Sequence, residues 1–182
     1  MDLRNLIILA AALCVSSGAA ADRGPGPVKL IECRMDACSW SRLVSNTRVV
    51  KKGDEELRKY VTMDGHSAHP DDMYPTRYSE RVRIDWERRP VTTYVLCSRR
   101  RPAIAFQDRS DSRSKGRWYA HYLDLFSLFG YNRSSAVIYA DACHKLAFNS
   151  GDAEKALRRL GYRPGSRNEQ IDLRGPMDLL KR

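Results

Sequence analysis

The densest group of side chains able to bind a metal lies in one short segment of the chain. His66, His69, Asp71 and Asp72 place two imidazoles and two carboxylates within the sequence His-Ser-Ala-His-Pro-Asp-Asp. Zinc and similar ions are bound by such groups. However, no helical pattern holds the two histidines on one face, and Pro-Asp-Asp is an ordinary turn sequence. A metal-dependent hydrolase using this segment is one hypothesis, and a solvated loop over residues 66–78 is the other.

A pair of carboxylates offers a second possible chemistry. Asp85 and Glu87 lie two residues apart in an alternating pattern that predicts a strand. Both side chains would then lie on its solvent-exposed face, about 7 Å from each other. That separation would suit acid–base catalysis. The neighbouring Arg83, Arg88 and Arg89 instead favour ordinary ion pairing across strands. The chain contains no glycine-rich phosphate loop and no G-x-S-x-G element.

A third group of residues is basic and suits an anionic ligand. We expect it at one end of two adjacent strands, with Trp118, Tyr119 and Tyr122 following directly. Basic residues interleaved with aromatic ones bind polyanions or glycans through charge and stacking. The alternative is a solvated hairpin above a strand core. The candidate anion ligands are Arg99, Arg100, Arg101, Arg109, Arg113 and Lys115.

Four cysteines, at positions 33, 38, 97 and 143, remain after the N-terminal segment discussed below. An even number in an exported chain predicts two disulfides. The short Cys33–Cys38 spacing can be closed by a tight turn, which leaves Cys97 with Cys143, a strand tied to a helix. The rival pairing joins Cys38 to Cys97 across a sheet. A catalytic thiol at Cys143 beside His144 is disfavoured, because adjacent helical residues point about 100° apart.

Residues 1–21 have the pattern of a secretory signal peptide. A short head carrying Arg4 precedes an apolar run over residues 6–15, and the segment ends in Ala19-Ala20-Ala21. The run is about half of the 20 residues that a spanning helix needs. Leu13 before Cys14 disfavours a lipoprotein signal. Cleavage after Ala21 would leave 161 residues without a transmembrane anchor, in the periplasm or outside the cell.

The composition is that of a basic globular protein. Hydrophobic residues make up 42% and charged residues 30% of the chain, and the net charge is +10, with 24 arginines against 8 lysines. Arginine suits bidentate contacts to carboxylate or phosphate, although a GC-rich genome would also enrich it. The charge favours an anionic cell-envelope polymer or an acidic protein as a partner. Nucleic acid is not expected, because an exported protein rarely meets it, and the sequence indicates no cofactor.

The organisation of the chain predicts an α+β fold. After a flexible leader over residues 22–27, a globular domain is expected over residues 28–162, followed by a weakly attached tail over residues 163–182. Short connections between consecutive strands favour antiparallel pairing. Helices are expected from Asn132 to about Phe148 and from Asp152 to Leu160, where Gly161 ends the second. The predicted strands cover residues 28–32, 39–50, 82–87, 91–98, 102–107 and 117–125. Residues 57–63 can form a strand or a short helix, and Tyr60-Val61-Thr62 favours the strand.

These patterns predict a mostly antiparallel sheet with C-terminal helices packed on one face, and disulfides that cross-link the domain. The clearest strand signal is the alternation over residues 82–87. One core is expected to hold Trp40, Trp86, Val95, Leu96, Cys97, Val137 and Ala140.

Several short motifs resemble a group of small exported proteins of alphaproteobacteria. They are Cys38-Ser39-Trp40, Tyr94-Val95-Leu96-Cys97-Ser98 followed by Arg101-Pro102-Ala103, Cys143-His144, and the segment His69 to Pro75, with Asp72 in place of a glycine. The resemblance covers residues 29–145 and implies that these positions form one unit. It carries over no activity and no functional residue.

The sequence therefore favours an exported, non-enzymatic protein that binds an anionic polymer or a protein partner. Two alternatives remain open: the metal-dependent hydrolase with His66, His69 and Asp71, and an inhibitor of cell-wall lysing enzymes, which small size, export and disulfides would suit.

Overall fold

The computed structural model describes residues 26–71, 73–79, 81–108, 116–127, 132–147 and 152–181. Within these residues the chain forms an eight-stranded antiparallel sheet, two α-helices and one 3₁₀-helix. The elements in chain order are β1 (Val28–Arg34), β2 (Ala37–Lys52), β3 (Glu55–Ala68), β4 (Asp85–Trp86), β5 (Val91–Cys97), β6 (Ala103–Gln107), β7 (Trp118–Tyr122), α1 (Asn132–His144), α2 (Ala153–Arg159), β8 (Glu169–Leu173) and η1 (Pro176–Leu180).

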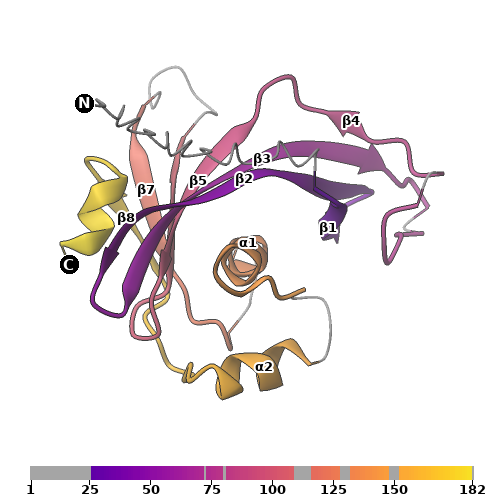
Figure 1. Ribbon diagram of the computed structural model, residues 1–182. Helices are drawn as coiled ribbons and strands as arrows, with labels where there is room; N and C mark the ends of the chain where they lie inside the picture. Colours follow the sequence, from indigo (N-terminus) through magenta and orange to yellow (C-terminus); the bar gives the residue numbers. More distant parts are fainter. Residues whose placement is uncertain are drawn as a thin grey trace, which may run out of the picture.

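The sheet curls around helix α1 (Figure 1). Neighbouring strands follow the order β1-β2-β3-β5-β6-β7-β8, and β4 pairs with β3 outside this path. Helix α1 lies in the concave face, α2 lies beneath α1, and η1 lies at the outer side of the sheet (Figure 1). The predicted α+β fold, with an antiparallel sheet and C-terminal helices packed on it, is confirmed.

Local sequence signals explain the long hairpin that forms the centre of the sheet. Gly53 has a φ of 61° at the turn between β2 and β3, a conformation that glycine adopts without steric cost. Two register shifts, between Leu43 and Ser45 and between Arg48 and Val50, interrupt the pairing of these strands. Such bulges increase local twist and bend a strand, which suits a sheet that wraps a helix.

Both predicted disulfides are present, and the favoured pairing is confirmed. Cys33–Cys38 closes the β1–β2 hairpin, and Cys97–Cys143 joins the end of β5 to α1. Met35 and Asp36 form the two-residue turn with φ values of 46° and 62°, as a hairpin of this length requires. Two disulfides indicate an oxidising, extracytoplasmic compartment.

The apolar interior is divided by the sheet into two clusters. Val95 lies in the cluster between the sheet and helices α1 and α2, which contains Tyr139 and Leu157. Leu96 points to the opposite face and packs with Leu179. The expectation of one core holding both Val95 and Leu96 was wrong, because successive side chains on a strand point to opposite faces and both faces are covered.

The C-terminal segment is a structural part of the sheet, and its description as a weakly attached tail was wrong. Strand β8 pairs with β7 along its length, from Trp118 opposite Leu173 to Tyr122 opposite Glu169. In η1, Leu179 is fully buried and Leu180 nearly so. The few apolar residues of this segment therefore cover the outer face of the sheet.

Two element boundaries differ from expectation. The alternating segment 82–87 shows the expected burial, with Val82, Ile84 and Trp86 half-buried, but only Asp85–Trp86 pairs as a strand. Helix α1 ends at His144, because Lys145 adopts a left-handed φ of 56°. Gly161 ends α2 as predicted, with a φ of 87°.

Among the described residues, no helix is long and apolar enough to span a membrane.

Candidate anion-binding site at the β5–β6 turn

The turn between β5 and β6 presents Arg99 and Arg100 to solvent. Its backbone is held by Ser98, whose side-chain oxygen accepts hydrogen bonds from the N–H groups of Arg100 at 3.3 Å and Arg101 at 3.2 Å. The same hydroxyl donates to Glu55 Oε1 at 2.9 Å. Ser98 is almost completely buried. The two exposed arginines therefore extend from a turn with a fixed backbone.

The third arginine of the turn points inward. Arg101 donates from Nε to Glu55 Oε1 at 2.8 Å and from a terminal nitrogen to Oε2 at 2.5 Å. The two side chains retain 23% and 15% of their exposure. The hydrogen bonds from Arg101 are the main reason why the pKa of the Glu55 carboxyl lies below its ordinary value. Arg101, expected to bind an anion, already holds a carboxylate of its own chain.

Helix α1 supports the turn from below through a buried hydroxyl. The Tyr139 hydroxyl donates to the carbonyl of Ser98 at 3.1 Å and accepts the Ser98 N–H at 3.0 Å. It lies 2.8 Å from the Tyr162 hydroxyl, which lies 2.7 Å from His144 Nε2. The single proton of Tyr139 goes to Ser98, so Tyr162 donates to Tyr139 and accepts from His144.

The ionisation of these groups is shifted toward their neutral forms. Burial raises the pKa values of Tyr139 and Tyr162. Burial, and then the charge of Arg99, lower the pKa of His144. Together with the Cys97–Cys143 disulfide, this neutral network joins the helix to the base of the basic turn.

Further basic residues lie beside the turn. Glu56 of β3 pairs with both Lys51 and Cys97, which places the end of β2 near the start of the β5–β6 turn. Lys51 and Lys52 are both exposed, and Lys52 Nζ donates to the carbonyl of Leu180 at 3.3 Å. In the part of the chain that the structure describes, Arg99, Arg100 and Lys51 form no ion pair with an acidic side chain.

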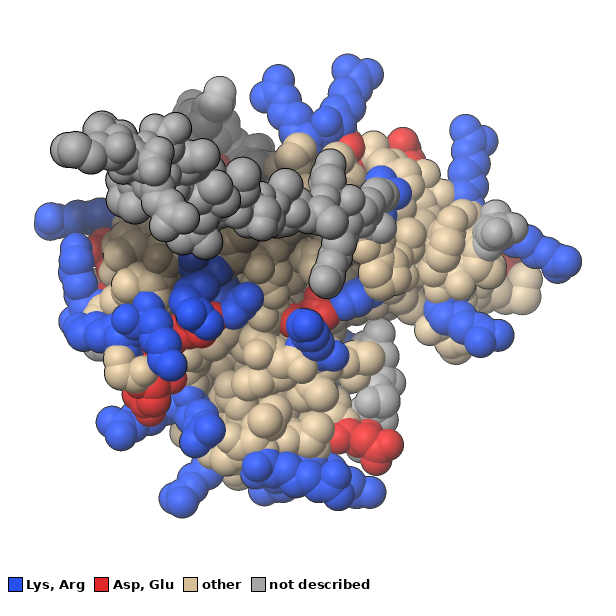
Figure 2. Space-filling model, in the orientation of Figure 1, with Lys and Arg blue, Asp and Glu red and all other residues tan. Residues whose placement is uncertain are grey.

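Figure 2 shows how the charge is distributed on one face of the molecule. Lysine and arginine side chains project around most of the outline, and several gather at the left, where Figure 1 places the tip of the β2–β3 hairpin. A few acidic side chains lie among them. The positive surface is thus broad, with a denser region near the basic turn.

The predicted basic group has three further members. Arg109, Arg113 and Lys115 lie outside the described residues. The aromatic residues that follow them divide between the two faces of the sheet. Trp118 packs edge-on against Tyr94 on the outer face, at 5.5 Å between ring centroids, whereas Tyr119 lies beside Phe106 on the concave face.

The histidine segment does not gather into a metal site among the described residues. His66 is exposed on β3, which extends to Ala68, so the expected loop begins only after the strand. Ser67 points to the opposite face, where its oxygen accepts from Trp40 Nε1 at 2.6 Å and lies 2.8 Å from His69 Nε2. His69 therefore lies on the opposite face of β3 from His66. Within the residues described, no three His, Cys, Asp or Glu side chains converge; Asp72 lies outside them.

The other two chemical candidates are also accounted for structurally. Asp85 and Glu87 are both exposed, and only Asp85 belongs to a strand. Cys143 is bonded to Cys97, so it offers no thiolate nucleophile. His144 is engaged with Tyr162 rather than with a cysteine.

One charged cluster could not be expected from sequence. Asp141 of α1 is nearly buried and binds both Lys29 of β1 and the hydroxyl of Tyr60 in β3. The two ion-pair partners are separated by 112 positions, so no local pattern connects them. The adjoining cavity measures about 10 Å³, which leaves room for at most a water molecule. We assign this cluster to the attachment of α1 to the sheet.

Comparisons of the chain with protein-family models, with curated proteins and with solved structures give no match.

Proposed function

We propose that the protein is an exported, non-enzymatic binding module that holds an anionic cell-envelope polymer at its β5–β6 turn. The observation that carries this proposal is the contrast between the arginines of the turn. Arg101 is held by Glu55, whereas Arg99 and Arg100 stay exposed without an acidic partner among the described residues. Two adjacent, exposed guanidinium groups suit the carboxylate or phosphate groups of a polyanion.

The rigidity of the turn favours binding. The backbone of the β5–β6 turn is held by hydrogen bonds to Ser98, whose hydroxyl is bound by Glu55 and whose carbonyl is bound by Tyr139. Because these bonds exist before a ligand arrives, binding does not need to order the turn. Preorganisation of this kind improves affinity by lowering the entropic cost of binding. The net charge of +10 adds a long-range attraction that concentrates anionic partners near the surface.

The proposed location follows from two features of the chain. The two disulfides favour an oxidising compartment, and the N-terminal sequence has the order of a secretory signal. The structure does not describe residues 1–25. We propose that the protein acts in the periplasm or outside the cell, where acidic polymers are accessible.

The test is a salt titration with a defined polyanion. Purified, oxidised protein is titrated with dextran sulfate at increasing sodium chloride, and with uncharged dextran of the same length as a control. Because exposed charges are screened over about 10 Å at 0.1 M and about 3 Å at 1 M salt, the affinity should fall steeply over this range. Uncharged dextran should not bind at this turn. Absence of dextran sulfate binding at low salt, or binding unaffected by salt, would contradict the proposal.

A further inference from the structure

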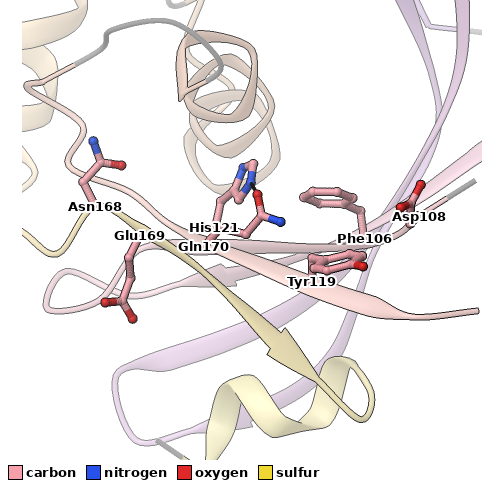
Figure 3. A pocket seen from close by; sticks show the side chains of 7 residues that line it. All are labelled: Phe106, Asp108, Tyr119, His121, Asn168, Glu169 and Gln170. Atoms are coloured by element: carbon pink, nitrogen blue, oxygen red, sulfur yellow. Dashed lines mark hydrogen bonds between the residues drawn. The ribbon is translucent and has the colours of Figure 1, made fainter. Parts of the chain in front are cut away.

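A second cavity lies on the concave face of the sheet, beside α1 (Figure 3). It has a volume of about 600 Å³, within the range of small-molecule sites. Strands β6, β7 and β8 provide its walls, and the basic turn takes no part in it. The cavity is lined by Phe106, Asp108, Tyr119, His121, Asn168, Glu169 and Gln170.

Aromatic rings form the floor of this cavity. Phe106 and Tyr119 are directly opposite on β6 and β7, with ring centroids 6.3 Å apart and planes that differ by 35°. His121 continues the row and meets Phe106 edge-on at 5.0 Å (Figure 3). Both Phe106 and Tyr119 are only half-buried. Two neighbouring rings at this small angle provide a shallow platform on which a flat apolar surface can stack.

Polar side chains border the platform at defined positions. His121 Nε2 lies 2.7 Å from the amide oxygen of Gln170, which can only accept, so this nitrogen donates. Its Nδ1 lies 3.2 Å from the hydroxyl of Ser135 in α1. The pair fixes the amide of Gln170 with its N–H groups available to a ligand. Asp108 lies beyond Phe106 at one end of the row and Asn168 at the other (Figure 3).

We propose that this cavity binds a β-linked saccharide whose pyranose rings carry equatorial substituents. Such rings expose axial C–H groups on both faces, and these stack on aromatic side chains, while their edges carry hydroxyl or acetamido groups. The amide N–H groups of the exposed Gln170 donate to hydroxyl oxygens at the edge of the sugar ring. Among the described residues, the lining holds two acidic side chains and no lysine or arginine, so the site favours a sugar without negative charge, which distinguishes it from the anion-binding turn.

The experiment is saturation-transfer NMR on the oxidised protein with two probes, cellotriose and chitotriose, each at millimolar concentration. Both probes consist of β-linked pyranose rings with equatorial substituents. Chitotriose carries an acetamido group on each ring where cellotriose carries a hydroxyl group. At least one should receive saturation, strongest at the axial protons of a ring face, and the stronger probe identifies the source of the ligand. No transfer to either probe, or transfer without preference for the ring-face protons, would overturn the proposal.

Three variants locate the signal. Phe106→Leu and Tyr119→Leu remove the flat ring while keeping apolar volume, and each should weaken binding by roughly tenfold, the cost of losing one stacked ring. Gln170→Ala alters an exposed side chain and should weaken binding without affecting the fold. Tyr94→Leu is the control, because it removes a ring from the opposite face of the sheet. Binding that persists in folded Phe106→Leu, Tyr119→Leu and Gln170→Ala proteins would exclude this cavity as the site.

Discussion

Glu55 and Arg101 form a bidentate ion pair between the start of β3 and the β5–β6 turn, across 46 positions of the chain. The pair neutralises the charge of one of three consecutive arginines within the chain, whereas Arg99 and Arg100 stay exposed. Because Ser98 contacts both Glu55 and the turn backbone, the charge pair and the shape of the turn depend on each other.

Replacing Glu55 by Gln should destabilise the protein by about 1.5–3 kcal/mol at neutral pH, the usual contribution of hydrogen bonds to charged groups. Glu154→Gln is the matched control. Its ion pair with Arg158 is more than half exposed and should contribute less than about 1 kcal/mol. Urea unfolding of both variants measures the difference, and equal effects of the two substitutions would contradict a structural role for Glu55.

The Glu55 contribution should also depend on pH. Its pKa is lowered on folding from an ordinary value of 4.5, so the folded state favours the ionised carboxyl. The stabilisation is therefore fully present above the unfolded pKa and is lost as the pH falls through the folded pKa. Urea unfolding from pH 7 to pH 3 should show the wild type approaching the stability of Glu55→Gln. A difference that is constant over this range would exclude the linkage.

The two disulfides should contribute unequally. In the chain-entropy model, the cross-link between Cys97 and Cys143, separated by 46 residues, contributes about 4 kcal/mol, and that between Cys33 and Cys38, separated by 5, about 2 kcal/mol. Paired Cys→Ser variants of each bridge, compared by thermal unfolding, measure this order.

Alkylation without reductant should label none of the four cysteines in exported wild-type protein, and labelled thiols would argue against one or both bridges.

Both faces of β5 should be sensitive to charge. Val95→Asp and Leu96→Asp each bury an unpaired carboxylate and should lower stability by several kcal/mol. Val44→Asp is the control, because the Val44 side chain on β2 is 52% exposed and should tolerate the change. Melting temperatures provide the comparison. Tolerance of Leu96→Asp alone would mean that the outer face of the sheet is not covered as described.

The C-terminal segment should be required for that coverage. Leu179 is fully buried, so Leu179→Ala should cost about 2–5 kcal/mol, as large-to-small substitutions in cores do. Met177→Ala, in the same 3₁₀-helix but 45% exposed, should have little effect. If denaturant unfolding showed both variants equal to wild type, the segment after Tyr162 would be an attached tail after all.

Local patterns predicted much of the fold, because strand alternation and turn residues act over short distances. The β-branched and aromatic composition of residues 91–98 predicted β5 to within one residue, and Gly161 marked the end of α2. The end of α1 was missed because Lys145, rather than a glycine, takes the left-handed conformation. The role of Leu179 was missed because a polar segment with few leucines gives no periodic signal, and its burial depends on a strand pairing with β7.

The candidate sites were less accessible to sequence reasoning. The run from Arg99 to Arg101 was visible, but the inward position of Arg101 depends on Glu55, which is distant in the chain. The histidine segment contained suitable ligand types, yet strand alternation at Ser67 separates His66 from His69. The cavity at Phe106 combines three strands, of which β8 was not expected.

The most direct test of anion binding compares two double variants that remove the same charge. Arg99→Ser with Arg100→Ser alters the turn, whereas Arg88→Ser with Arg89→Ser alters two exposed arginines between β4 and β5, near the middle of β3. We expect the first to weaken dextran sulfate binding at low salt by roughly tenfold, through the loss of two close charge contacts, and the second to change it by less than about twofold. Equal weakening by both variants would show that binding depends on net charge alone and would contradict a site at the β5–β6 turn.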